Sequence, residues 1–516
     1  MTRLMLGLSC LLACGPMPEA LDLSHSAQLV PSASAREGGR STAARVPSVA
    51  APSGGSTDSA QQNVLDGAAS SVSVDTRLSS PDWVSYGHDM SNTRHNPAEQ
   101  TIGVDNVSKL ELRWSWTTAA VTGTPAYRDG SLYFGDWQGA TVGLDAATGR
   151  ERWRTLDAQN LVGQITTSAF VDEDAVYIGG VFATWYRLNR ATGALEWRAP
   201  VHQGGSSNSL SSLQRIGDLA IAGVASFQNI NPIDTVVGAP PFRGSIIAVN
   251  AKTGAKVWER VLTTGTGVGV CSSPAFDPER RRMFIGTGQN YDDSDSPYAD
   301  SLIALDYETG EYAWHVQYTK ADAWWLGNMD DGDLDILSTP VLYTANGVDM
   351  VAAGDKGGTL RAFDRDGKPQ WTRQLTPGGH HGGIMGSPAY HDQTIYICSG
   401  DFSTDQGDGT GHSGPASSVL FALDAGTGDV RWSVPVDGLC YGSITHANGV
   451  VYLPGGSGRL QAFHDRDGRE LWSVDLGSSS AGGVTVAHGM LYVSYGWDWT
   501  DPAPLGGIRA FGLPYR

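Results

Sequence analysis

Five aspartates and two tryptophans lie within the seventeen residues TKADAWWLGNMDDGDLD, which run from Thr319 to Asp335. Carboxylates spaced one to three residues apart around a glycine can surround a hard cation such as calcium. The run Asp330–Asp335 lacks the full twelve-residue pattern of a calcium loop, so a solvated acidic turn is the alternative. Crowded carboxylates repel one another, and at least one should have a raised pKa unless a cation is present.

The bulk composition limits what such a site can serve. The chain has 516 residues and a formal net charge of −19. This balance argues against nucleic-acid binding, which needs basic surface to neutralise phosphates. The 66 glycines indicate many tight turns, and many tight turns indicate many short strands.

The N-terminus MTRLMLGLSCLLACG has the features of an export signal. Arg3 is followed by a short apolar run, Leu4 to Leu12, which is too short to cross a bilayer as a helix. Leu-Leu-Ala before Cys14 resembles the bacterial lipobox, which implies a signal peptide over residues 1–13 and a lipid on Cys14. Gly15 stands where an inner-membrane retention signal would have aspartate, so the resemblance implies sorting to the outer membrane. An ordinary signal peptide is the alternative.

Residues 14–81 are expected to form a disordered tether. They are rich in Ser, Ala, Pro and Gly, as in EGGRSTAAR and APSGGSTDSA. Such sequence cannot bury enough apolar surface to offset its ordering entropy. If Cys14 carries the lipid, three cysteines follow it in the chain, Cys271, Cys398 and Cys440, and an odd number leaves at least one thiol unpaired.

A repeat appears after Trp83. Seven segments place a glycine four residues before a tryptophan: LDAATGRERW, LNRATGALEW, VNAKTGAKVW, LDYETGEYAW, FDRDGKPQW, LDAGTGDVRW and FHDRDGRELW. Alternating apolar runs and turns precede several of them, which is the pattern of successive strands. The repeat tryptophans recur every 40 to 61 residues. Repeats of this length built from short strands predict an all-β propeller of four-stranded antiparallel blades.

The two ends of the repeat region complement each other. Leu110–Trp116 reads as an outer strand without its preceding turn, and the C-terminal GGIRAFGLPYR lacks a following tryptophan. Pairing these strands leaves no open edge. We therefore predict eight blades over residues 82–516, closed by the N- and C-terminal strands, with the repeat tryptophans packed between blades rather than serving as a substrate cage.

The repeat A-x-D-x-x-T-G-x-x-x-W resembles that of pyrroloquinoline-quinone (PQQ) dehydrogenases. DWVSYGHD from Asp82, NTRHN from Asn92 and NVSKL from Asn106 look like the lead-in that these enzymes carry before the first blade. SSPAFDPERRRMFIGTGQNY, DAWW and DGDLD resemble the polyvinyl-alcohol dehydrogenase branch. The resemblance covers about residues 82–516 and implies a propeller with PQQ and calcium in its central funnel.

The resemblance also implies cofactor-binding residues. Lys356, in GDKGGTLRAFD, matches the position where lysine or arginine contacts the quinone, and a solvated turn lysine is the alternative. Gln289 and Asn290, in GTGQN, lie where the family uses an amide to reach calcium, with a strand-end turn as the alternative. Trp324 is a further candidate for contact with the cofactor, because the family uses aromatic stacking on the quinone.

The catalytic base and the metal ligands are expected in the opening stretch. The base in the alcohol-dehydrogenase branch follows the tryptophan of an Asp-x-Trp-Asp motif, where this chain has Asp322-Ala-Trp324-Trp325. The candidates for base or catalytic acid are Asp322, Asp331 and Asp333, and the candidates for calcium ligands are Asp330 and Asp335. His380 and His381 resemble a cofactor-facing segment, although at most one of two adjacent residues on a strand faces the funnel.

Four positions depart from the family pattern. Cys271 replaces a stacking tryptophan, Pro240-Pro241 replace a vicinal cysteine pair, Phe227 and Gln228 replace acidic residues, and Trp325 replaces the base. Three functions therefore stay open. The first is an exported PQQ-dependent dehydrogenase of secondary or polymeric alcohols that passes electrons to a separate cytochrome. The second is a non-catalytic scaffold with a protein partner at the outer membrane. The third is a carbohydrate-binding propeller using exposed Trp324, Trp325, Trp497 and Trp499.

Overall fold

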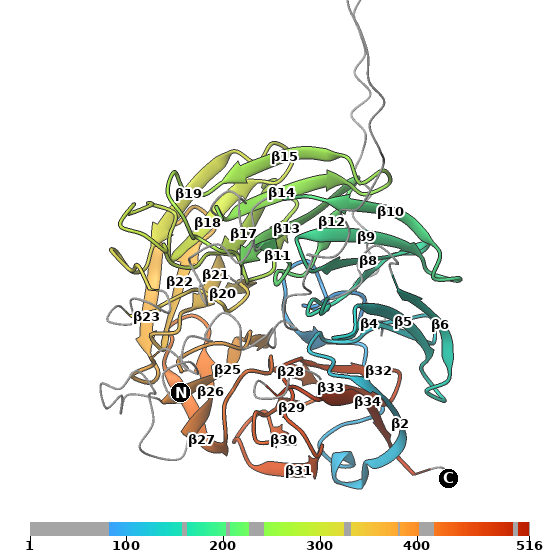
Figure 1. The fold of residues 1–516 in the computed structure, drawn as a ribbon. Coiled ribbons are helices and arrows are strands. Elements are labelled where there is room, and N and C mark those ends of the chain that lie inside the picture. Colours follow the sequence, from blue (N-terminus) through green and yellow to red (C-terminus); the bar gives the residue numbers. More distant parts are fainter. Residues whose placement is uncertain are drawn as a thin grey trace, which may run out of the picture. The chain divides into compact units, whose positions relative to one another are not determined.

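The computed structural model describes residues 82–156, 163–202, 207–226, 242–324, 332–379, 382–401, 417–498 and 504–514. These residues form eight antiparallel sheets of four principal strands, which follow one another around a common centre (Figure 1). The prediction of an eight-bladed, all-β propeller is confirmed. The predicted signal peptide, the tether and Cys14 lie outside the described residues.

Each blade runs from its innermost to its outermost strand in chain order. The first four blades are β3 (Ala126–Arg128), β4 (Ser131–Gly135), β5 (Ala140–Asp145) and β6 (Glu151–Leu156); β7 (Phe170–Val171), β8 (Ala175–Gly180), β9 (Thr184–Asn189) and β10 (Leu195–Pro200); β12 (Gln214–Ile216), β13 (Leu219–Ser226), β14 (Ser245–Asn250) and β15 (Lys256–Val261), with β11 (Ser207–Asn208) also on β13; and β16 (Ala275–Asp277), β17 (Arg282–Gly286), β18 (Ser301–Asp306) and β19 (Tyr312–Gln317). The next three are β20 (Val341–Ala345), β21 (Val348–Gly354), β22 (Thr359–Asp364) and β23 (Pro369–Gln374); β24 (Ala389–His391), β25 (Thr394–Asp401), β26 (Ser417–Asp424) and β27 (Val430–Asp437); and β28 (Thr445–Ala447), β29 (Val450–Pro454), β30 (Arg459–His464) and β31 (Glu470–Asp475).

The eighth blade joins the two ends of the propeller. It contains β32 (Val484–Ala487), β33 (Met490–Tyr495), β34 (Leu505–Gly512) and, as its outermost strand, β2 (Glu111–Ala119). Strand β2 pairs antiparallel with β34 from Glu111 opposite Gly512 to Ala119 opposite Leu505. The predicted closure by N- and C-terminal strands is therefore confirmed, and it gives the eighth blade its fourth strand.

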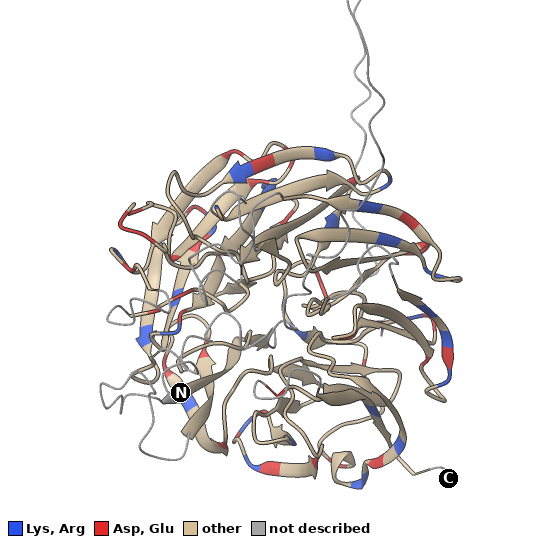
Figure 2. Cartoon of the chain, viewed as in Figure 1, with Lys and Arg blue, Asp and Glu red and all other residues tan. Residues whose placement is uncertain are grey.

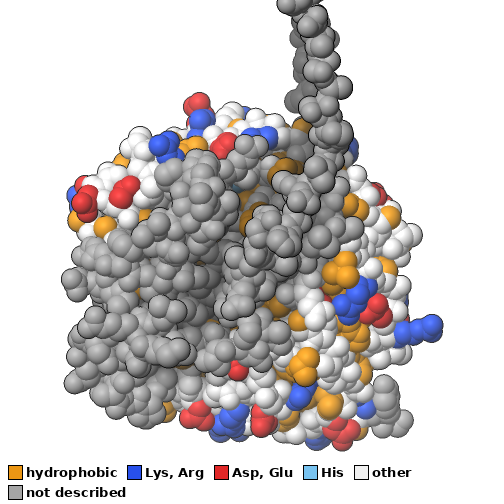
Figure 3. Space-filling view, in the orientation of Figure 1, with side chains coloured by type: hydrophobic (Ala, Val, Ile, Leu, Met, Phe, Trp, Pro, Cys, Tyr) orange, Lys and Arg blue, Asp and Glu red, His pale blue; other side chains and the backbone are white. Residues whose placement is uncertain are grey.

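Burial follows position within the blade. The second and third strands are buried on both faces, as in β4 and β5, because neighbouring blades cover both sides. The outer strands alternate between exposed and buried side chains, as in β10. Charged residues gather on outer strands such as β6, β15 and β31 (Figure 2). The visible face in the space-filling view carries hydrophobic side chains beside charged ones (Figure 3).

The repeat tryptophans connect each blade to the next one. The indole nitrogen of Trp258 donates to the carbonyl oxygen of Tyr307 in the following blade at 3.0 Å, and Trp314 does the same to Arg365 at 2.9 Å. Equivalent bonds of 2.8–3.0 Å are made by Trp114, Trp153, Trp197, Trp371 and Trp432. The expectation that these rings pack between blades is confirmed.

The repeat glycine completes this contact. Gly310 adopts φ +70°, and a Cβ atom placed there would lie 2.6 Å from the ring of Trp258 in the preceding blade. The other six repeat glycines have φ between +70° and +88° and face the preceding blade's tryptophan in the same way. Glycine is therefore required both by the left-handed turn and by the closeness of the indole.

The lead-in before β2 crosses the inner strands of the propeller. Backbone bonds join Trp83 to Tyr127 on β3 and Arg94 to His446 on β28. Between them, Val84, Met90, Ser91 and Thr93 accept backbone bonds from β7, β16, β20 and β24. Strand β1 (His95–Asn96) then pairs parallel with β28, and a single 3-10 turn, η2 (Val107–Lys109), follows. The segment from Trp83 to Asn96 thus contacts blades that are far apart in sequence.

Two further features concern cysteines and membranes. Cys398, on β25, forms a disulfide with Cys440, which precedes β28, so the bond connects adjacent blades.

Among the described residues, no helix is long and apolar enough to span a bilayer.

We predict that Gly310→Ala destabilises the protein much more than Gly347→Ala. Both glycines have positive φ, but a Cβ atom at Gly347 meets nothing within 4 Å. Both variants carry the cost of a left-handed alanine, about 1 kcal/mol, while only Gly310→Ala displaces the indole of Trp258. The free energy of unfolding, from denaturant titration, should differ by at least about 1 kcal/mol between the variants. Equal losses would contradict the role assigned to the tryptophan contact.

Candidate functional site

A cavity of about 140 Å³ lies at the centre of the ring, where the chain enters the innermost strands. All eight blades contribute to its wall. The lining residues are Tyr86, Thr122, Gly123, Thr166, Ser168, Leu210, Ser212, Cys271, Ser273, Leu337, Thr339, Met385, Tyr441, Ser443, Ala481 and Gly482. The wall is therefore a mixture of hydroxyl, apolar and aromatic groups, with Cys271 among them.

A belt of hydroxyl groups surrounds this cavity. The backbone N–H of Ser168 donates to Ser212 Oγ at 3.0 Å, and Ser212 N–H donates to Ser273 Oγ at 3.0 Å. In the described residues the same bond recurs from Ser273 to Thr339, Thr339 to Ser387, Ser387 to Ser443, Gly483 to Thr124 and Thr124 to Ser168. Seven of the eight blades thus satisfy a buried N–H of a neighbouring blade, which fixes the diameter of the opening.

The lead-in supplies the side chains at the base of the cavity. Tyr86 Oη lies 2.6 Å from both Ser387 Oγ and Ser443 Oγ, which are members of the belt. The fully buried Arg94 guanidinium lies over the rings of Trp83 and Tyr86. It occupies the place where a side chain at Gly483 would otherwise point. Burial lowers the pKa of Arg94 to about 10.

A buried acidic cluster lies where the fourth and fifth blades meet. Its segments are the turns that follow β17, precede β18, follow β19, precede β20 and follow β21. The side chains of Asp300, Asp322, Asp333, Asp335 and Asp355 all have exposed fractions of 3% or less. The cluster adjoins the cavity wall, because Asp335 stands two residues before the lining residue Leu337 and Gly288 N–H donates to Gly269, two residues before Cys271.

Lys356 is the cation at the centre of this cluster. Its Nζ atom lies 2.5 Å from Asp333 Oδ2, and neither side chain is exposed. Its backbone N–H donates to the carbonyl oxygen of Asp335 at 3.0 Å. The alternative of a solvated turn lysine is therefore wrong. Asp333 itself adopts φ +48°, a left-handed conformation that aspartate tolerates better than most residues.

The predicted amides hold the opposite side of the cluster. Gln289 N–H donates to Asp335 Oδ1 at 2.9 Å, and the Gln289 side-chain amide lies between the Asp335 carboxylate and the Trp324 carbonyl oxygen. The side-chain oxygen of Asn290 accepts from Ser296 N–H at 3.3 Å within its own turn. Asn290 N–H also donates to the Asp322 carbonyl oxygen at 3.2 Å, which anchors the segment that carries the candidate base.

Asp322 has one carboxylate oxygen occupied and one without a partner. Oδ2 accepts from Leu334 N–H at 2.8 Å, whereas Oδ1 is buried and has no hydrogen-bond partner among the described residues. Burial, together with repulsion from Asp333, raises the pKa of Asp322. The structure therefore leaves one oxygen available for a proton, a cation or a hydroxyl group of a ligand.

Asp300 and Asp355 belong to the cluster but were missed by sequence reasoning. Both oxygens of Asp300 are buried and lack hydrogen-bond partners within the described ranges. Burial and repulsion from Asp322, Asp335, Asp333 and Asp355 raise its pKa well above the usual value. Burial also raises the pKa of Asp355, which pairs with Arg361. A lone acid beside a strand, as in YADSLIALD, carries no signal of this placement.

The cluster has the composition of a cation site without its geometry. Five buried carboxylates face Lys356 and Arg361, so negative charge is in excess and oxygen donors are at hand for a hard cation. Among the described residues, however, no three of these carboxylates form a group compact enough to hold a metal ion by themselves. A cation would therefore also need amide or backbone oxygens, for example from Gln289 or Asn290.

The remaining predicted site residues are distributed as follows. Asp330, Asp331, Trp325, His380, His381 and three of the four departures from the family pattern lie outside the described residues. Trp324 and Trp497 have exposed fractions of only 1% and 3%. The expectation that these two rings are exposed for carbohydrate binding is therefore wrong, because both indoles are enclosed by the blades.

The fold and its repeat contacts define a β-propeller with PQQ-type repeats. The profile of the family described as Outer membrane protein assembly factor BamB matches residues 104–291, 242–411 and 356–496. Together these ranges cover most of the chain, and the chain belongs to this family. The resemblance to PQQ-dependent dehydrogenase propellers is also confirmed by the relatives that follow.

Two polyvinylalcohol dehydrogenases are among the similar proteins. The one from a Pseudomonas species is 24% identical over 76% of this chain and 67% of its own length. The one from a Sphingopyxis species is 25% identical over 68% of this chain and 58% of its own length. The chain thus spans about two thirds or less of the length of these relatives.

The solved structures establish similarity of fold. A quinohemoprotein alcohol dehydrogenase from Comamonas testosteroni superposes with a TM-score of 0.68 at 20% identity, covering 84% of this chain and 81% of that one. BamB from Moraxella catarrhalis superposes with a TM-score of 0.52 at 16% identity, covering 79% of this chain and 98% of that one.

We predict that Lys356→Met costs about 3–5 kcal/mol of unfolding free energy, because it leaves the Asp333 charge buried without its cation. Lys252→Met is the matched control, since Lys252 and Asp218 form an ion pair with side chains about 70% exposed, and it should cost less than about 1 kcal/mol. Adding Asp333→Asn to Lys356→Met should recover part of the loss. If the losses of unfolding free energy from Lys356→Met and Asp333→Asn simply add in the double variant, the Lys356–Asp333 pairing is contradicted.

We further predict that calcium stabilises the protein more at pH 8 than at pH 5. The folded-state pKa values of Asp300 and Asp322 are raised, so the cation-free protein loses stability as pH rises through the unfolded values toward the folded ones. Calcium requires ionised carboxylates and should offset that loss, by about 2.7 kcal/mol at a hundredfold excess over Kd. Melting curves with calcium and with chelator measure this.

Asp300→Asn should reduce both the slope of stability against pH and the calcium effect. Asp293→Asn, at an exposed position seven residues earlier, is the control and should change neither. A calcium effect of the same size in Asp300→Asn as in the control would remove Asp300 from the cation site.

Proposed function

We propose that this protein is an exported PQQ-dependent dehydrogenase of secondary or polymeric alcohols, anchored to the outer membrane by a lipid on Cys14. Electrons would leave through a separate cytochrome. The proposal is supported by the similarity to polyvinylalcohol dehydrogenases and by membership of a family described through an outer-membrane assembly factor. The observation that carries it is the buried acidic cluster around Lys356, beside the central cavity.

Calcium fits the cluster by its donors and its charge. The two oxygens of Asp300 are buried without hydrogen-bond partners in the described residues, which is costly unless a proton or cation is present. Asp335 and the amides of Gln289 and Asn290 lie around the same turns. Asp330 would complete the ligand set from the segment that connects Trp324 to Gly332.

The quinone would occupy the cavity above Tyr86. Its planar rings need aromatic or apolar faces, and the wall offers Tyr441, Met385 and Leu337 as well as Cys271. Tyr441 is held by an edge-on contact with Trp497, whose ring centroid lies 4.6 Å away. Trp324 would border the cofactor from the acidic side. When bound, PQQ supplies the redox chemistry by accepting two electrons and two protons from an alcohol.

The residues of this chain would manage the proton of the substrate hydroxyl. Asp322 is the best-placed base, because Oδ1 has no hydrogen-bond partner among the described residues and because burial and Asp333 raise its pKa above the usual value. Lys356 would keep Asp333 ionised, and the pair would polarise the quinone and fix the loop that carries Leu334. Asp331 would act as the second acid if its loop reaches the cavity.

A non-catalytic scaffold is the second candidate. Cys271 supplies a small thiol where the enzymes place a stacking ring, which weakens the expected grip on a quinone. The family description and the fold of Moraxella BamB agree with an assembly role at the outer membrane. In that case the acidic cluster would have no catalytic role, and the functional surface would lie elsewhere.

The test is reconstitution with PQQ and calcium, followed by dye-linked oxidation of 2-butanol and polyvinyl alcohol. Wild-type protein should bind one quinone per chain and oxidise both alcohols. Asp322→Asn should lower kcat by about a hundredfold or more while quinone binding persists, because it removes a general base. Asp467→Asn, at a carboxylate 58% exposed, is the matched control and should retain full activity.

Two results would overturn the enzyme proposal. One is the absence of quinone binding by equilibrium dialysis with a folded protein saturated in calcium. The other is quinone binding with no turnover, together with a membrane protein that co-purifies in stoichiometric amount, which would favour the scaffold.

A further inference from the structure

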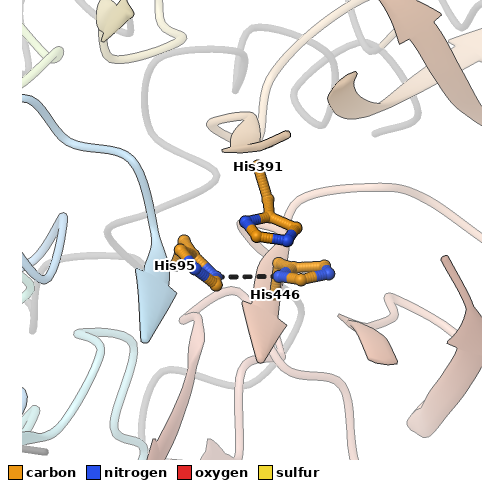
Figure 4. Close-up of side chains that lie close together, drawn as sticks. All are labelled: His95, His391 and His446. Carbon is orange, nitrogen blue, oxygen red and sulfur yellow. Dashed lines mark hydrogen bonds between the residues drawn. The ribbon is translucent and has the colours of Figure 1, made fainter. Parts of the chain in front are cut away.

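Three histidines from distant parts of the sequence meet at the other end of the propeller strands. His95 lies on β1, His391 ends β24, and His446 lies in the middle of β28 (Figure 4). One ring nitrogen from each lies within 4.8 Å of the others. The acidic cluster lies before the innermost strands begin, whereas these histidines lie where those strands end, so the two groups are separate.

The nitrogen atoms of two of these rings point at each other. His446 Nδ1 lies 2.8 Å from His95 Nδ1, as the dashed line in Figure 4 shows. Burial and the neighbouring imidazoles lower the pKa of His95, and burial lowers the pKa of His446. A neutral imidazole offers a lone pair on one of its two nitrogens, and neutral imidazole is a frequent metal ligand in proteins.

A carboxylate decides which nitrogen of His446 carries its proton. Nε2 of His446 lies 3.2 Å from Asp465 Oδ2. A proton on Nε2 satisfies this carboxylate and leaves the lone pair of Nδ1 directed toward His95. Metal-binding histidines commonly donate their second ring nitrogen to a carboxylate in this way, which orients the ring and raises its basicity.

The third ring is close but must turn to become a ligand. His391 is stacked on His446, with 4.5 Å between ring centroids and 19° between their planes. Tyr396 also stacks on His446, with 5.4 Å between ring centroids and 8° between their planes, while His391 is partly exposed. Nitrogens bound to one tetrahedral zinc are about 3.3 Å apart, so binding also widens the His95–His446 pair by about 0.5 Å.

We propose that His95, His391 and His446 form a binding site for a borderline transition-metal ion, such as Zn²⁺ or Cu²⁺. Three imidazole nitrogens with an open side suit these ions rather than calcium or magnesium, which prefer oxygen ligands. The partly exposed His95 and His391 provide the entry path. Water would fill the fourth position.

The ion would fasten the lead-in to the propeller. His95 belongs to the segment that crosses the inner strands, and His391 and His446 belong to two adjacent blades. Bonds from one ion to all three histidines would oppose separation of β1 from β28. Strand β1 has only two residues, His95 and Asn96, which pair with β28. The inferred role is therefore structural and independent of PQQ or calcium.

The experiment titrates Zn²⁺ and Cu²⁺ into the full chain after removal of metal by chelator, with calcium present to occupy oxygen sites. Calorimetry should show one ion per chain, and melting curves should shift upward with added Zn²⁺. His391→Ala should weaken Zn²⁺ binding at least tenfold, and Asp465→Asn by about 10- to 100-fold. His488→Gln is the matched control, since His488 is 44% exposed, pairs with Asp82 and should leave binding unchanged.

Absorption spectroscopy keeps the test independent of any variant that fails to fold. X-ray absorption of the wild-type Zn²⁺ complex should count three imidazole ligands, and Co²⁺ substitution should give the intense visible bands of a tetrahedral site. The proposal is overturned if fewer than two imidazoles bind the ion, if no stoichiometric binding occurs, or if His391→Ala and His488→Gln bind Zn²⁺ equally well.

Discussion

The contact between each repeat tryptophan and the glycine turn of the next blade is the interaction on which the propeller depends. The indole nitrogen of Trp314 donates to the Arg365 carbonyl oxygen, and its ring lies where any side chain at Gly367 would be. The hydrogen bond fixes the direction of the indole ring, and the missing Cβ atom lets the ring lie close to the turn of the next blade. Repeated around the ring, this pair of constraints determines the angle between consecutive blades and hence the width of the centre.

The centre is in turn completed by residues that no single blade supplies. The hydroxyl belt needs a Ser or Thr from the neighbouring blade to satisfy each buried N–H. The belt is interrupted at Gly483, which lacks a hydroxyl, and the Arg94 guanidinium occupies that gap. The lead-in therefore acts as part of the core, although it precedes the first strand of the sheet system. Its Tyr86 closes the base of the cavity, so the lead-in also limits what the cavity can hold.

Burial of five carboxylates beside one lysine is costly for folding alone. A buried ion pair is weak support for stability, and a buried acid without a partner opposes it. The propeller carries this cost at the junction of blades four and five, next to the cavity, rather than scattering it. A cluster of buried carboxylates with raised pKa values suits a site for a cation and a proton-transferring group. In a purely structural protein the same buried charges would only destabilise the fold. The two proposed functions therefore differ in whether calcium is expected to stabilise the protein.

The sequence predicted the fold well and the site in part. The spacing of Gly and Trp, the alternating strands and the incomplete ends were enough for eight blades and their closure, because each feature acts within one repeat or between neighbours. Lys356 and Asp322 were found through the family resemblance, and their burial was not foreseen. Asp300 was missed because nothing local distinguishes a buried acid that precedes a strand from one at the surface. Trp324 and Trp497 were expected to be exposed, and packing between blades encloses them.

What the sequence by itself determined is therefore periodic: which residues start strands, which turn, and which ring contacts the next blade. Those properties depend on backbone conformation and on neighbours a fixed distance along the chain. Tertiary structure alone decided which residues of different repeats share a space. Asp300 and Asp355 belong to one acidic cluster although 55 residues separate them in the chain. His95 and His446, which are 351 residues apart, meet because the closed ring returns its last blades to the lead-in. Charge burial and ligand geometry are set by those meetings, and no local pattern encodes them.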